Sequence, residues 1–155
     1  MSTMYDALVA FFDEDDWRYE EMPDKSCLRL GFAGKNANFI CYAEAHEAIE
    51  TLVFYSVYPL KVPENKRIAA AEYLTRANYG LFVGNFELDF RDGEVRFKTS
   101  VDAEDVDAAP LIKRIVYTNV VMADKYFHGL MQVIYSEVEP KLAVEHAETR
   151  TGVEN

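Results

Sequence analysis

The sequence predicts an α+β domain in which an antiparallel sheet packs on helices, in the order α-β-β-β(-β)-α-β-β-α. Three observations predict this class. Apolar residues recur at helical spacing in three segments, at residues 5–12, 68–77 and 111–134. Several segments between them, such as residues 17–22 and 86–91, alternate apolar with polar residues, which is typical of strands. The pair Asp92-Gly93 stands between two alternating runs and indicates a β-hairpin.

Size and composition are those of one folded domain. The chain has 155 residues, 50% of them apolar and 14% aromatic, which is enough for a single core. Its net charge of −11 repels nucleic-acid phosphates and anionic membranes, so we expect neither as a partner. The acidity indicates solubility, or a partner with basic or amphipathic segments. We assign residues 1–139 to one α+β domain and residues 140–155 to a polar C-terminal tail.

The sequence also predicts the cellular compartment. Its first residues lack a basic region followed by an apolar stretch, and the longest apolar segment, residues 51–60, is too short to span a bilayer. Cys27 and Cys41 lie within apolar strand patterns and lack C-x-x-C spacing, so both are expected to be buried thiols. We therefore expect a cytoplasmic protein.

The first half of the chain is predicted to form one helix and three or four strands. Ser2 or Thr3 can cap the helix, which ends in the acidic residues 13–16. Three strands of a meander follow, at residues 17–22, 27–33 and 38–43. Residues 51–58 form the strongest β segment because of their β-branched and aromatic content.

The second half is predicted to form a helix, a hairpin and a long final helix. After a loop framed by prolines, Pro63 suits the first turn of a helix, and Asn78 with Gly80 tolerates the left-handed conformation that ends it. The hairpin strands are expected at residues 86–91 and 95–101. Pro110 then begins a helix expected over residues 109–137, long enough to span the sheet.

The third and fourth predicted strands are apolar on both faces. Helices cover only one side of such a sheet, so the other side needs a second covering. We expect either the seam of a homodimer or a bound segment of a protein partner, added as a strand or laid on as a helix. The residues assigned to this face are Ile40, Tyr42, Val53, Tyr55 and Val57.

The sequence contains none of the common catalytic, cofactor or metal motifs. Its acidic runs, residues 13–16 and 102–107, lack the D-x-D-x-D-G spacing of a calcium loop. There is no G-x-S-x-G elbow and no G-x-x-x-x-G-K-[ST] phosphate loop. His128, on the long helix, is interpreted as a surface or packing residue. We therefore expect neither enzymatic activity nor a cofactor or metal.

One motif runs from the end of the second predicted helix into the hairpin. Its residues are Leu74, Asn78-Tyr79-Gly80-Leu81-Phe82-Val83-Gly84-Asn85-Phe86-Glu87-Leu88-Asp89 and Asp92-Gly93-Glu94-Val95-Arg96-Phe97. Gly80 and Gly84 permit a turn with positive φ and a close backbone approach, and Asn78 can cap backbone groups at this junction. The motif is mainly structural, and it resembles the central signature of the YbjN-like family of bacterial sensory-transduction regulators.

This resemblance spans roughly residues 5–136 and includes Asn119 and Asp124 of the long helix. It implies a fold similar to type III secretion chaperones, which are small, acidic, cytoplasmic and commonly dimeric. The function it implies is a non-enzymatic interaction module, chaperone-like or regulatory, that binds a segment of a protein partner through the apolar sheet face. The alternative is a sensory or regulatory domain that takes a small ligand in a cleft between the long helix and the sheet.

Overall fold

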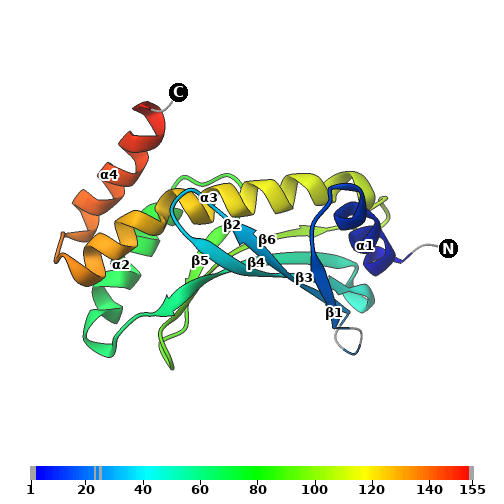
Figure 1. The fold of residues 1–155 in the computed structure, drawn as a ribbon, viewed down its shortest axis with the longest axis horizontal. Helices are drawn as coiled ribbons and strands as arrows, with labels where there is room; N and C mark the ends of the chain where they lie inside the picture. The colour runs from blue at the N-terminus through cyan, green and yellow to red at the C-terminus, as the bar shows by residue number, and fades with distance from the viewer. Residues whose placement is uncertain (1–2, 23, 25, 154–155) are drawn as a thin grey trace.

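The computed structural model describes residues 3–22, 24 and 26–153, which form one six-stranded antiparallel sheet and four α-helices (Figure 1). The strands are β1 (Tyr19–Met22), β2 (Cys27–Ala33), β3 (Asn38–His46), β4 (Thr51–Lys61), β5 (Asn85–Leu88) and β6 (Glu94–Asp102), in the sheet order β1-β2-β3-β4-β6-β5. The helices are α1 (Met4–Glu14), α2 (Arg67–Asn78), α3 (Ala109–Tyr135) and α4 (Pro140–Val153), with short 3-10 helices η2 (Glu47–Ile49) and η3 (Glu64–Lys66). The predicted α+β class is confirmed, and so is the predicted order of elements as far as α3.

The long helix α3 lies along the sheet and organises the helical layer. Figure 1 shows α1 near the beginning of α3, and α2 and α4 near its end. Strand residues that point toward α3 are buried, such as Phe54 in β4 and Phe97 in β6, whereas their neighbours along each strand are half-buried or exposed. One face of the sheet therefore holds the core, and the other points away from α3.

Thr3 caps the first helix. Its hydroxyl accepts a hydrogen bond from the Asp6 N–H at 3.0 Å, and its own N–H donates to the Asp6 carboxylate at 3.1 Å. This reciprocal pair satisfies backbone groups that the first turn leaves without helical partners. Of the two predicted caps, Thr3 is confirmed, and Ser2 lies outside the described residues.

A buried amide fixes α3 on the sheet. The Asn119 side chain donates to the carbonyl oxygens of Phe54 in β4 at 2.8 Å and Phe97 in β6 at 3.0 Å. The Ser56 hydroxyl donates to the Asn119 amide oxygen at 2.6 Å. Because a buried polar group is costly when unpaired, this pairing favours one position of the helix over the two central strands.

Strand β4 is longer than predicted. The sequence predicted a strand over residues 51–58 and then a loop framed by prolines, but the strand continues through Pro59 to Lys61, and its register with β6 shifts between Val57 and Lys61. Proline has no N–H to donate to a neighbouring strand, so it fits where the regular ladder is interrupted. Beyond the register shift, Lys61 still pairs with Glu94 of β6, so β4 stays in the sheet up to the next loop.

The C-terminal segment is a packed helix rather than the predicted polar tail. Residues Pro140–Val153 form α4, which contacts α2 and α3, and its Ala143 and Ala147 side chains are buried. The prediction is thus wrong for residues 140–153, because a few small apolar residues on one side suffice to hold a mostly polar helix on its neighbours. Residues 154–155 of the predicted tail lie outside the described residues.

Candidate functional site: the outer face of the sheet

The candidate site is the outer face, the side of the sheet that points away from α3. It is built by alternate residues of five strands: Arg29, Ile40, Tyr42, Glu44, Val53, Tyr55, Val57, Glu87, Arg96 and Lys98. Their strand neighbours, such as Cys41 and Phe54, point to the core and are buried. Side chains alternate between the two faces of a strand, so the listed residues share one face.

The structure places all five residues that the sequence assigned to a binding face on this one surface. Ile40 stands directly opposite Val57, and Tyr42 opposite Tyr55, on the adjacent strands β3 and β4. Ile40 is 42% exposed, while the other four are half-buried by their neighbours. Val53 lies two residues before Tyr55 on the same side of β4 and extends the patch toward η2.

Strand register adds basic residues that the sequence analysis did not assign to this face. Arg29 lies opposite Tyr42, and Lys98 lies opposite Tyr55, so a row of Arg29, Tyr42, Tyr55 and Lys98 crosses four strands. Arg96 lies opposite Val57 in the neighbouring row. The alternation of Arg96 and Lys98 with apolar residues in β6 was visible in the sequence. Their position beside the tyrosines depends on pairing between distant segments, which the sequence does not specify.

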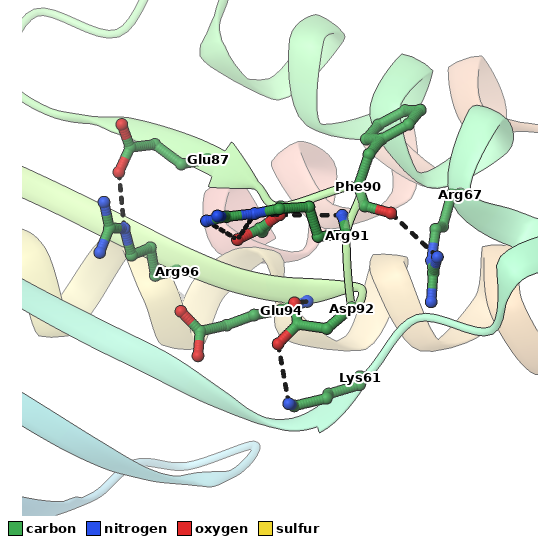
Figure 2. A network of polar contacts seen from close by, with 9 residues as sticks. Lys61, Arg67, Glu87, Phe90, Arg91, Asp92, Glu94 and Arg96 are labelled. Atoms are coloured by element: carbon green, nitrogen blue, oxygen red, sulfur yellow. Dashed lines mark hydrogen bonds and ion pairs between the residues drawn. The ribbon is translucent and has the colours of Figure 1, made fainter.

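Charged and aromatic groups contact each other on the outer face. The Arg96 guanidinium lies 4.1 Å from the centre of the Tyr55 ring, a cation–π arrangement. Arg96 also donates to one oxygen of Glu87 at 2.7 Å, and Lys98 donates to the other at 2.9 Å (Figure 2 shows the Arg96 contact). Two cations thus share one carboxylate.

These contacts set the ionisation of the groups involved. Burial opposes ionisation of Glu87, but hydrogen bonds from Lys98 and Arg96 outweigh it and hold the pKa of this carboxyl below its usual range. Burial also raises the pKa of Tyr55 above its ordinary value. Tyr55 therefore stays a neutral phenol at physiological pH and offers a hydroxyl at the end of an apolar ring.

A second group of polar contacts holds the β5–β6 hairpin beside this face. Lys61 donates to Asp92 at 2.8 Å, and Arg67 donates to the Phe90 carbonyl at 3.0 Å (Figure 2). Arg91 hydrogen-bonds the Asp89 side chain, and that contact lowers the pKa of Asp89 to about 2. The hairpin is thereby attached to β4 and α2, which supports the position of Glu87 and Arg96.

The motif residues Asn78, Gly80, Gly84, Asp92 and Gly93 lie away from the outer face, at the ends of α2 and β5. The Asn78 amide accepts from the Phe86 N–H at 2.6 Å and donates to the Phe86 carbonyl at 3.2 Å. It thus occupies both backbone groups of an edge-strand residue. The three glycines all have positive φ, between 84° and 91°. These residues shape the backbone between α2, β5 and β6.

Metal-ligating side chains are dispersed over the described part of the chain. No cluster of three or more His, Cys, Asp and Glu side chains there is placed to hold a metal ion. Cys41 is buried, and burial raises the pKa of its thiol to about 11. The same residues include no helix long and apolar enough to cross a membrane.

The sequence profile of one protein family, described as "Putative bacterial sensory transduction regulator", matches residues 5–131. The chain belongs to the YbjN family. The match covers α1, the whole sheet, α2 and most of α3, and it ends before α4. The predicted resemblance to this family is confirmed.

Solved structures with the same arrangement include a YbjN protein. The crystal structure of YbjN from E. coli is 14% identical, covers 76% of this chain and 84% of its own, and superposes with a TM-score of 0.60. At this identity the likeness shows the shared fold. A second structure, the HopA1–SchA chaperone–effector complex, is 17% identical over 72% of this chain and 83% of that one, with a TM-score of 0.44. None of the curated proteins matches the sequence.

Proposed function

We propose that this YbjN-family chain is a non-enzymatic protein-interaction module, chaperone-like or regulatory, that binds a segment of a protein partner through its outer face. One observation carries the proposal. The outer face combines the aliphatic residues Ile40, Val53 and Val57 with the facing pair Tyr42 and Tyr55, on the side of the sheet away from α3. Aromatic residues and arginine are enriched in protein interfaces, because one side chain offers both apolar area and polar contacts.

The edge strands favour docking on the face over addition of a new strand. At the β5 edge, the Asn78 side chain already holds the backbone N–H and carbonyl of Phe86. At the β1 edge, the strand has four residues, and Glu20 and Glu21 are exposed on it. Short, charged or covered edges resist strand addition. A helix or extended segment laid across Ile40 and Tyr55 would instead bury apolar surface without pairing with an edge strand.

The same face can be covered by a second copy of the chain, and we propose that the protein is a homodimer in the cytoplasm. A two-fold axis places the same patch on both subunits, so a self-complementary apolar surface suffices. The chain's net charge of −11 favours neither nucleic acid nor an anionic membrane as the covering partner. The partner segment would then bind the dimer or replace one subunit of it.

Site-specific photo-crosslinking in the native host tests this function. A benzophenone amino acid placed at Tyr42, on the outer face, is expected to form a discrete adduct with a protein chain. The matched control is the same amino acid at Tyr79, which is 91% exposed but lies outside the outer face. An adduct with twice the chain mass indicates the homodimer, and a heavier or lighter adduct identifies a partner. Equal adducts at both positions, or none at Tyr42, would contradict the proposal.

A further inference from the structure

A groove of about 830 Å³ lies between α3, α4 and the turn that joins β2 to β3. It is separate from the outer face, because its helical walls belong to the other layer of the molecule. Apolar side chains of Phe32, Val120 and Val121 line it, and Val121 is 54% exposed. Its volume lies within the range of small-molecule sites.

The turn at one side of the groove is held rigidly by Asp124 of α3. The Asp124 carboxylate accepts hydrogen bonds from the backbone N–H groups of Lys35 and Asn36, at 3.1 and 2.9 Å. A third N–H, from Ala37, lies 3.3 Å from it. A side chain at Gly34 would meet an Asp124 oxygen at 2.2 Å, so the turn fits closely against the helix. The groove is therefore formed before any ligand binds.

The polar residues around the groove favour an anion. Lys35, Lys125, His128 and His146 all line it. Asp124 is the one carboxylate among the described lining residues, and its oxygens already receive the three backbone N–H groups. Two lysines and two imidazoles thus surround an apolar floor, in a chain whose net charge is −11. A positive rim in an acidic protein attracts a small anion locally.

We propose that this groove binds a small amphiphilic carboxylate, with its apolar body against Phe32 and Val121 and its carboxylate paired with Lys35 and Lys125. The chemistry follows from the two kinds of lining: apolar side chains bury a hydrocarbon body, and ammonium groups pair with a carboxylate. One wall is supplied by His146 of α4, which lies beyond the residues that match the family profile. The site is therefore a property of this chain's C-terminal helix as well as of its YbjN-family fold.

Octanoate is the probe that tests the proposal, titrated into the full chain and followed by calorimetry and by NMR of the backbone amides. Saturable binding is expected, with shifts concentrated at Val121, Lys125 and the β2–β3 turn. Acetate, which lacks the apolar body, and octylamine, which reverses the charge, are expected to give no saturable binding. Shifts at Tyr42 and Tyr55 in place of the groove would overturn the proposal, as would equal binding of octylamine or no binding of octanoate.

Variants separate the charge contribution from the apolar one. The double substitution Lys35→Gln and Lys125→Gln is expected to weaken octanoate binding roughly tenfold, since it removes both ammonium groups. The matched control is Lys113→Gln, an exposed lysine on α3 that does not line the groove and is expected to leave binding unchanged. Val121→Glu places a carboxylate at an exposed position of the floor and is expected to abolish binding while the chain stays folded. Unchanged affinity in both the double variant and Val121→Glu would overturn the assignment.

Discussion

Asn119 is the polar side chain on which the position of α3 most depends. It is fully buried, and its amide bridges the carbonyl groups of Phe54 and Phe97 on neighbouring strands. The Ser56 hydroxyl donates to its oxygen. An aliphatic residue in its place would remove these hydrogen bonds from buried polar groups. The cost of an unsatisfied buried group exceeds the net gain from forming its hydrogen bond, so the loss is large.

Asn119→Leu is therefore expected to lower the free energy of unfolding by about 3 kcal/mol, measured by urea denaturation followed by circular dichroism. The apolar volume of leucine does not replace the hydrogen bonds that Asn119 donates to the Phe54 and Phe97 carbonyl groups. Asn65→Leu is the matched control, at an exposed position in η3, and should change stability by less than about 0.5 kcal/mol. Equal losses in the two variants would show that the buried bridge contributes nothing specific.

Gly93, in the turn between β5 and β6, occupies a position that only glycine fits well. Gly93 has φ of +85°, and a side chain there would lie 2.2 Å from the carbonyl oxygen of Val62. Gly80 has φ of +91° but nothing within 4 Å of its missing side chain. Gly31, in the middle of β2, has neither a positive φ nor a close neighbour. The three positions thus separate backbone strain from steric overlap.

Alanine substitutions at the three glycines are expected to rank in that order. Gly93→Ala should cost at least about 3 kcal/mol of unfolding free energy, because strain and overlap both act. Gly80→Ala should cost about 1 kcal/mol from backbone strain alone. Gly31→Ala should stay within about 0.5 kcal/mol. Urea denaturation of the three variants measures this, and a Gly31→Ala loss as large as that of Gly93→Ala would contradict the assignment.

Elements with strong local signals could be predicted from the sequence, and elements held by tertiary contacts could not. β2 begins and ends where predicted, at Cys27 and Ala33, because turn residues stand on both sides of it. The long helix was predicted to within two residues at its end, since its apolar repeat continues for its whole length. By contrast, α4 has only a narrow apolar side, with Ala143 and Ala147 buried, and its helical state depends on α2 and α3.

The candidate site could likewise be predicted only in part from the sequence. Alternation in β3 and β4 was enough to group Ile40, Tyr42 and Tyr55, because side chains of one parity share a face. The basic residues Arg29 and Lys98 were missed, since they reach the tyrosines only through pairing of β2 with β3 and β4 with β6. The groove could not be located from the sequence, because its walls come from three separate segments of the chain.

At the scale of the whole molecule, one helical layer on one sheet leaves a large surface that the fold itself does not cover. The acidity of the chain acts against covering it with a second copy, since two molecules of net charge −11 repel each other. Apolar burial at Ile40 and Val57 must exceed that repulsion for a homodimer to form. Salt screens the repulsion between whole molecules and slightly strengthens burial of apolar surface.

Self-association is therefore expected to increase with ionic strength, measured by light scattering at several protein concentrations. Ile40→Lys places a charge at the centre of the proposed seam, so it should shift the mass from two chains to one and change the melting temperature of the monomer little. Ile49→Lys is the matched control, on η2 and 67% exposed, and should leave the mass at two chains. A single-chain mass for the unmodified protein at every concentration and salt would remove the homodimer and leave the outer face to a different protein partner, because the crosslink at Tyr42 detects either.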